Sequence, residues 1–203
     1  MAKRKVRNVS AALLLAACSA AFGIENAQPL PAAANELLQM YPGARIHKEQ
    51  DRVRIIYGMP MTPGRDAKNA AGNWIQLHGE AFGCGKLEVR ETYNVPFSDG
   101  SKTAISYQQF IGGVPVEYGA LKVLVLNGAV PQVVYAAGTL APAPADGFAR
   151  PSLTGETAVQ IVRAMPVWKK VPHWSKAELV VFQGNGDWTA PVLAWKFVGE
   201  NAD

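Results

Sequence analysis

The chain has 203 residues, of which 49% are hydrophobic and 18% charged, so it is long and apolar enough to bury the core of one large or two small domains. Its 20 Lys and Arg residues outnumber its 16 Asp and Glu residues, but four of these cations lie within residues 1–7. Without residues 1–23 the two signs balance at 16 each, which excludes nucleic acid or an anionic membrane surface as the partner of a basic face.

Residues 1–23 have the pattern of an export signal. Several cations precede a short apolar stretch over residues 9–17, which is too short to cross a membrane as a mature helix. Residues 15–18 (Leu-Ala-Ala-Cys) resemble a bacterial lipobox, in which Cys18 is lipidated and becomes the mature N-terminus. Cleavage by ordinary signal peptidase near residues 21–23 is the alternative. We therefore expect an exported protein that is periplasmic, an outer-membrane lipoprotein or secreted, and that meets a membrane only through a lipid anchor.

Residues 24–65 are predicted to form an N-terminal helix and hairpin. The helix is expected near residues 35–40, because Tyr-Pro-Gly follows and stops it. Residues 44–57 then alternate as a hairpin that turns near Glu49 to Asp51, with Val53 and Ile55 on one face.

Residues 66–140 are predicted to form a unit in which one helix packs against an antiparallel sheet. The helix covers residues 66–79 and is closed by Gly79, because apolar residues recur at helical spacing. Four strands are expected after it, in two pairs that turn at Ser-Asp-Gly and Asn-Gly; their ranges are 86–94, 102–110, 116–126 and 130–137.

The composition changes at residues 141–152, where Pro and Ala dominate without periodicity, as in a linker. Residues 153–203 follow as a second module, with a helix capped by Thr154 and strands over 177–182 and 192–198. The predicted fold class is therefore α+β, with two small modules after an export signal and antiparallel sheets each packed by a helix.

Catalytic patterns are absent from the sequence. His47, His78 and His173 are isolated and none forms the H-E-x-x-H pair of a zinc hydrolase. No serine lies in a G-x-S-x-G turn, and neither phosphate-loop nor dinucleotide-binding glycine patterns are complete. Cys84 is interpreted as a small buried apolar residue rather than a reactive thiol. We expect no catalytic residue, no metal site and no cofactor, while the five tryptophans could serve the core or a binding groove.

Two stretches of this chain resemble the fungalysin/thermolysin propeptide (FTP) domain. In the first, residues 74–83, a helix ends at Phe-Gly; in the second, residues 107–116, Tyr-Gln-Gln is followed by Gly-Val-Pro-Val. The Asn127-Gly128 turn continues the pattern. Residues 153–165 and the Leu-Ala-Trp at 193–195 are similar to a PepSY-type region. The resemblance covers roughly residues 66–200, with 66–140 as the FTP-like module and 153–203 as a PepSY-like module that lacks its usual further strands.

The resemblance implies the non-catalytic pro-region of a thermolysin-type zinc metallopeptidase precursor, acting as intramolecular chaperone and inhibitor. Its partner would be a zinc metallopeptidase domain, either in the same chain or separate. A stand-alone exported protein or lipoprotein that binds or inhibits a peptidase is the alternative. The Gly-Gly-Val-Pro step could shape a sheet edge for partner binding, or a covered corner that closes the fold. The candidate partner-binding residues are Tyr107, Gln109, Gly113, Pro115 and Val116.

Overall fold

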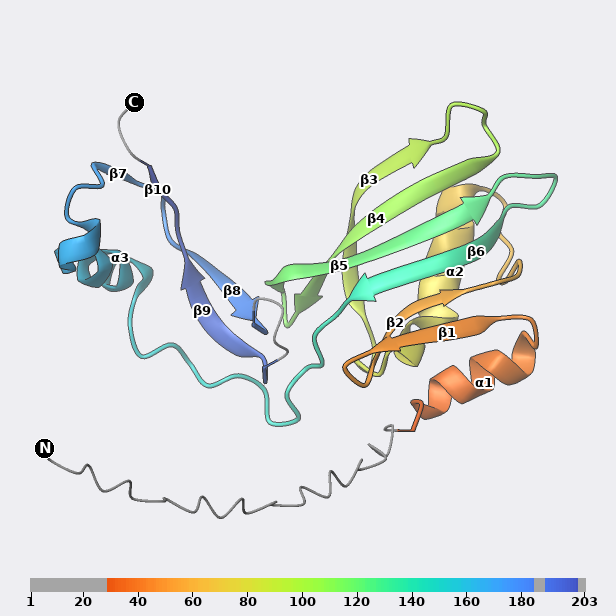
Figure 1. Cartoon of the computed structure of the whole chain (residues 1–203), viewed down its shortest axis with the longest axis horizontal. Helices are drawn as coiled ribbons and strands as arrows, with labels where there is room; N and C mark the ends of the chain where they lie inside the picture. Colours follow the sequence, from red (N-terminus) through yellow and green to blue (C-terminus); the bar gives the residue numbers. More distant parts are fainter. Residues whose placement is uncertain (1–28, 185–188, 201–203) are drawn as a thin grey trace, which may run out of the picture.

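The computed structural model describes residues 29–184 and 189–200 (Figure 1). The predicted export signal, including Cys18, lies outside the described residues. The described part contains α-helices and a curled mixed sheet, which confirms the α+β class. None of its helices combines the length and the apolar character needed to cross a bilayer.

The main sheet contains six strands that all pair antiparallel, in the spatial order β1-β2-β6-β5-β4-β3. Their bounds are β1 Arg45–Glu49, β2 Arg52–Tyr57, β3 Glu88–Pro96, β4 Lys102–Ile111, β5 Val114–Leu126 and β6 Gln132–Thr139. The predicted hairpins of residues 86–110 and 116–137 are therefore confirmed, with ends that differ by a few residues. Because β2 pairs with β6, the N-terminal hairpin belongs to the same sheet as the strands that follow.

The N-terminal hairpin differs from its prediction in one respect. Its turn is formed by Gln50 and Asp51, both with positive φ, as a tight two-residue turn requires. The expectation that Val53 and Ile55 share a face is wrong, because Val53 and Ile56 are the buried pair. A bulge shifts the pairing of β1 with β2, so that His47 faces Ile55 while Lys48 already faces Val53. The extra residue, Arg54, reverses the alternation and turns Ile55 to the other side.

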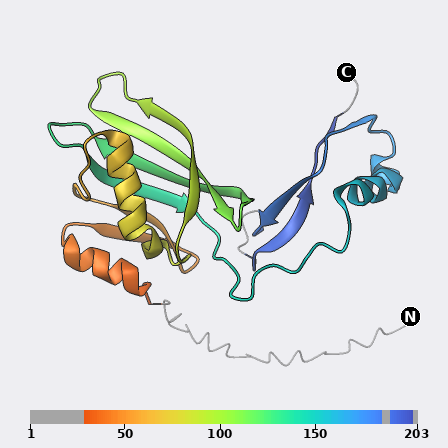
Figure 2. The same cartoon turned by 180° about the vertical axis from the view of Figure 1, so that it is seen from behind.

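Helices α1 (Ala32–Met40) and α2 (Ala67–His78) pack on one side of this sheet (Figure 2). The Asp66 side chain caps α2 by accepting from the Asn69 N–H at 2.7 Å. The predicted end of this helix at Gly79 is confirmed, because α2 stops at His78 with Gly79 as its C-cap. Gly79 has a helical φ of −58°, and the chain continues from it as a separate 3-10 helix, Gly79–Phe82. This extra turn places Phe82 in the core, and Gly83, with a φ of 76°, ends it.

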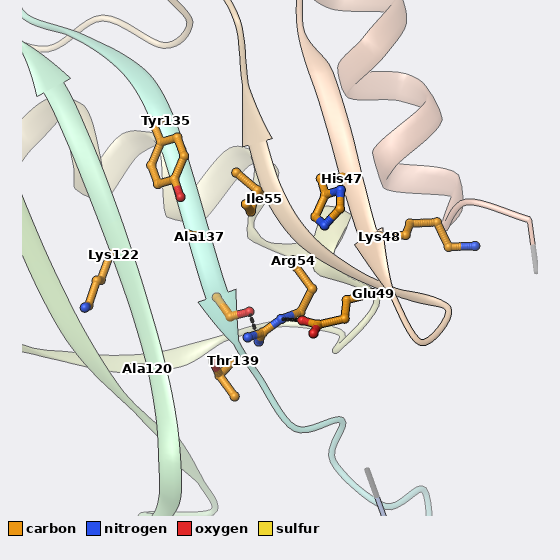
Figure 3. A pocket seen from close by; sticks show the side chains of 11 residues that line it. His47, Lys48, Glu49, Arg54, Ile55, Ala120, Lys122, Tyr135, Ala137 and Thr139 are labelled. Atoms are coloured by element: carbon orange, nitrogen blue, oxygen red, sulfur yellow. Dashed lines mark hydrogen bonds and ion pairs between the residues drawn. The ribbon is translucent and has the colours of Figure 1, made fainter. Parts of the chain in front are cut away.

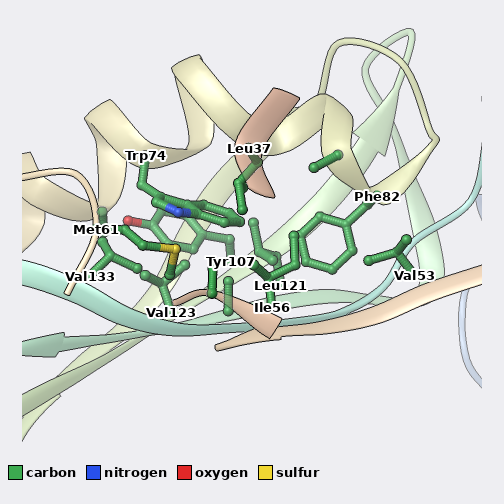
Figure 4. Close-up of a cluster of buried hydrophobic side chains, with 14 of the residues drawn as sticks. Leu37, Val53, Ile56, Met61, Trp74, Phe82, Tyr107, Leu121, Val123 and Val133 are labelled. Carbon is green, nitrogen blue, oxygen red and sulfur yellow. The ribbon is translucent and has the colours of Figure 1, made fainter. Parts of the chain in front are cut away.

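The core lies between the two helices and the sheet (Figure 4). Alternate residues of β5 point into it, as the pleat of a strand requires. Its largest fully buried side chains include Leu37, Ile56, Met61, Trp74, Ile105 and Leu121. Burial of each such side chain contributes about 1.5–3 kcal/mol, so this face of the sheet supplies most of the stability.

The part of the chain that was predicted to form a second module begins with α3 (Gly155–Ala164), whose predicted cap is confirmed because Thr154 accepts from the Thr157 N–H at 3.2 Å. A 3-10 helix Pro166–Trp168 and the strands β7 His173–Trp174, β8 Glu178–Phe182, β9 Val192–Lys196 and β10 Gly199–Glu200 complete it. No residue of α3 is buried, and in Figure 1 the helix lies beside one end of the β8–β9 pair. One parallel pairing, Val116 with Val181, joins β8 to β5, which makes the sheet mixed.

Candidate functional site

The predicted hairpin is held by the two glutamines of its Tyr-Gln-Gln sequence. Tyr107 points into the core, where burial raises its pKa to about 12. Gln108 lies opposite a bulge of β5, and its amide donates to the carbonyl oxygens of Val116 at 2.7 Å and Gly119 at 2.9 Å. Because of the bulge, these carbonyl oxygens do not pair with backbone N–H groups of β4. The Gln108 side chain takes the place of the missing backbone donor.

Gln109 ties the hairpin to the start of the linker. The side chain is only 2% exposed, and its amide nitrogen donates to the carbonyl oxygen of Ala141 at 2.7 Å. Its amide oxygen accepts from the Ala141 N–H at 2.8 Å. The side chain thus pairs with a backbone residue as a neighbouring strand would, and fixes where the chain leaves β6.

The other predicted residues separate into a buried and an exposed group. Val116 is buried with Ala141 and Val181, so the structure brings Val116 and Gln109 together around the linker. Gly113 lies at the exposed tip, where it has a φ of 79° and donates its N–H to a carboxylate oxygen of Glu88 at 3.1 Å. Pro115, half-buried, follows it. The geometry favours the covered corner for the buried residues, and the partner-binding role of the hairpin stays a prediction for its tip.

Among residues 29–184 and 189–200, no helix lies on the side of the sheet that faces away from α2 (Figure 1). Strand register places a continuous set of apolar side chains there, with Val95 beside Ala104, Leu124 beside Tyr135, and Tyr135 beside Tyr57. Tyr93 and Lys122 flank Ser106 in the adjacent row. We call this surface the open face and define it by Tyr57, Tyr93, Val95, Lys122, Leu124, Leu126 and Tyr135. Sequence reasoning missed it, although the apolar alternation of Tyr93 and Val95 was a signal.

A hollow of about 550 Å³ lies at one side of the open face (Figure 3). Arg54, the bulge residue, reaches across it, donating to Glu49 at 3.0 Å and to the carbonyl oxygen of Gly138. Lys122 and Tyr135 border the same hollow from β5 and β6. Lys122 is exposed and forms no hydrogen bond or ion pair with any residue that the structure describes. The hollow is lined largely by charged and polar side chains, among them His47, Lys48 and Glu49, and Lys122 adds an exposed positive charge at its border.

A second hollow, of about 640 Å³, lies between α3, residues 174–177 and Trp195 of β9. It is lined by Trp174 and Trp195, whose indole N–H groups donate to the carbonyl oxygens of Val171 at 3.2 Å and Leu153 at 3.0 Å. The Trp195 bond links β9 to the segment just before α3, whereas the Trp174 bond is local. Trp74 belongs to the main core, and Trp188 lies outside the described residues.

The histidines and the cysteine do not assemble a reactive centre in the described chain. His78 is buried against Trp74 and Tyr41, and this burial lowers its pKa. Burial raises the pKa of the Cys84 thiol to about 11, which leaves it a weak nucleophile. Across residues 29–184 and 189–200, no three His, Cys, Asp or Glu side chains gather closely enough to hold a metal ion.

The strands that carry the open face also carry a known motif. Residues 85–134 match the Fungalysin/Thermolysin Propeptide Motif. The match covers about a quarter of the chain, from just before β3 into β6, and includes the Tyr-Gln-Gln and Gly-Val-Pro-Val segments. It is a propeptide motif and not a catalytic one, so the predicted resemblance is confirmed for these residues. No curated protein matches the chain.

Proposed function

We propose that this chain is the non-catalytic pro-region of an exported thermolysin-like zinc metallopeptidase, acting as chaperone and inhibitor of the peptidase domain. The observation that carries the proposal is the propeptide motif over residues 85–134, which coincides with the strands β3 to β6 at the centre of the sheet. The peptidase domain is the partner, in the same precursor or as a separate chain.

The architecture suits a binding role. Helices α1 and α2 and a large core stabilise one face of the sheet, while no described helix covers the other face, which is therefore available to a partner. A ligand that binds the folded peptidase but not its unfolded chain shifts the folding equilibrium towards the folded state. The same binding restrains activity when it covers the substrate cleft. Chaperone and inhibitor are thus two results of one association.

The remaining parts of the proposal rest on sequence patterns. Residues 1–23 direct export, Cys18 is the lipidation residue if the lipobox is used, and residues 153–203 form a PepSY-like module beyond the linker at 141–152. The single parallel pairing between β5 and β8 supports a division of the chain at this linker. Mass spectrometry of the mature N-terminus tests the lipid anchor, because an acylated Cys18 is expected and its absence removes the lipoprotein.

Refolding of the peptidase tests the function. The denatured catalytic domain of a thermolysin-type peptidase from the same genome is diluted with and without this chain, and recovered peptide hydrolysis is measured. We expect the chain to raise the recovered activity when it is later removed, and to inhibit the mature enzyme. Failure to do either contradicts the proposal. Inhibition without assisted refolding would favour the alternative, a stand-alone exported inhibitor.

A further inference from the structure

We propose that the open face is the surface on which the peptidase domain docks, and that Lys122 pairs there with a carboxylate of the peptidase. This inference rests on the function proposed above and specifies the chemistry of the contact. The partner surface is apolar and carries at least one Asp or Glu that lies opposite Lys122 in the complex.

The apolar side chains of the open face are the first argument. Tyr57, Tyr93 and Val95 are 40%, 49% and 52% exposed, and Leu126 lies in the same set. With Tyr135 of β6, the residues of the open face come from four strands and form one continuous surface by register. Exposed apolar residues are ordinary when scattered, but a contiguous aromatic surface with a polar rim marks an interaction site.

Charge identifies the kind of partner. Arg54 on the rim already pairs with Glu49, and Arg90 at the β3 edge has a carboxylate oxygen of Glu88 at 3.5 Å. Lys122 stands between Ser106 and Ala137 in the register, and has no acidic partner among the described residues. A partner that covers Lys122 must supply a counter-charge, because a buried unpaired ammonium is costly. An acidic group within an apolar surface meets both requirements.

The same charge argues against a second copy of this chain as the occupant. A symmetric dimer is formed by identical surfaces, so two open faces in contact bring Lys122 of each copy into the same interface. Neither copy contributes an unpaired carboxylate from the open face, since its defining residues contain no Asp or Glu. Like charges would then be desolvated together, which opposes association.

The position of the propeptide motif supports a peptidase as the occupant. Tyr93, Val95, Lys122, Leu124 and Leu126 all lie within residues 85–134, on the matched strands. Their side chains point away from the core, so core packing does not require their apolar character. Along the matched strands, side chains that pack in the core therefore alternate with side chains of the open face.

Two variants of the full chain test the inference against an inactive variant of the peptidase that it refolds or inhibits. Lys122→Glu reverses the central charge, and Tyr93→Ser with Val95→Ser removes apolar contacts. We expect dissociation constants, measured by biolayer interferometry, to rise about 30-fold or more for the charge reversal and about tenfold for the double variant.

Matched controls lie outside the open face. Lys86→Glu makes the same change of charge in the exposed segment before β3, and Leu77→Ser alters a side chain of α2 that is 67% exposed. Both controls should bind like the wild type, and circular dichroism should show all variants folded. The Lys122→Glu variant is also tested against peptidase variants in which one carboxylate residue at a time is changed to Lys. The peptidase change that restores the affinity identifies the partner of Lys122 in the ion pair.

Other results overturn the inference. If the wild type binds the peptidase and the open-face variants bind equally well, the docking surface lies elsewhere while the proposed function stands. If the wild type binds no such peptidase, the proposed function fails and the docking surface fails with it. Sedimentation that shows a wild-type dimer abolished by Lys122→Glu would make the open face a self-association surface. Binding to anionic vesicles that depends on Lys122, with peptidase affinity unchanged, would make it a membrane surface.

Discussion

Replacement of Gln109 is the sharpest test of how the hairpin works. Gln109→Leu introduces an apolar side chain of similar size and removes both hydrogen bonds to Ala141. Ala141 has no exposed surface, so its N–H and its carbonyl oxygen both lose their partner inside the protein. Each buried group left unpaired costs about 1–3 kcal/mol, which places the loss at about 2–6 kcal/mol.

The position of Ala141 limits this loss. It begins a linker whose following residues are mostly exposed, so the segment can move and let water reach the two backbone groups. We therefore expect the free energy of unfolding to fall by about 2–3 kcal/mol, the lower part of the range. Urea unfolding followed by circular dichroism measures the fall. Hydrogen exchange should show the Ala141 amide to be the group that loses protection.

Gln109→Glu provides a matched variant of the same shape. The new carboxylate still accepts from the Ala141 N–H but cannot donate to its carbonyl oxygen, and burial raises the pKa of the new carboxyl. A raised folded-state pKa means that stability is retained at low pH and lost as the pH rises through it. Relative to the wild type at each pH, this variant should therefore be more destabilised at pH 7.5 than at pH 5. A change below about 0.5 kcal/mol in Gln109→Leu, with Ala141 still protected, would refute the reasoning.

Three further predictions concern other buried groups. Burial lowers the pKa of His78, so below about pH 6.5 the unfolded chain takes up a proton that the folded chain does not. Stability should fall from pH 7.5 to 5.5, and equal slopes in the wild type and His78→Gln would contradict this. With its pKa near 11, Cys84 should react with iodoacetamide at pH 8 about a hundredfold more slowly in the folded chain than in urea, by peptide mapping. Equal rates would show an accessible thiolate. Val181→Asp places a carboxylate against Val116 and should speed proteolysis of residues 142–153 about tenfold or more, while the main unfolding transition is kept. An unchanged cleavage rate would show that this pairing does not hold the second module.

The sequence was sufficient for those parts of the fold that depend on neighbours along the chain. Helical spacing identified α2, and the Asn127-Gly128 turn placed β5 beside β6. The bulge at Arg54 was not predictable, because one inserted residue leaves no mark in a short strand. The 3-10 helix that follows α2 over Gly79–Phe82 was missed, because the burial of Phe82 in the core depends on distant contacts and leaves no local sequence signal.

The candidate site depended even more on distant contacts. Gln109 was identified from a motif, but its partner Ala141 is 32 residues away and the bond uses that residue's backbone, which no side-chain pattern reveals. Val116 was likewise identified as part of a sheet edge, whereas β8 covers it from the second module. The alternation of Tyr93 and Val95 was a signal for an apolar face, but that face could not be assigned to the outside of the sheet before it was known which side the helices cover.

Strand β5 shows why the open face requires an explanation beyond stability. Leu121, Val123 and Val125 are buried beneath the helices, and the alternate positions Lys122, Leu124 and Leu126 point away from them. An antiparallel sheet with one solvated face ordinarily places polar residues at such alternate positions, because apolar side chains gain little there. Leu124 and Leu126 depart from that rule while Lys122 follows it. A surface that is apolar without contributing to the core, with the exposed Lys122 in it and Lys102 beside Leu126, is what an interface of complementary charge requires.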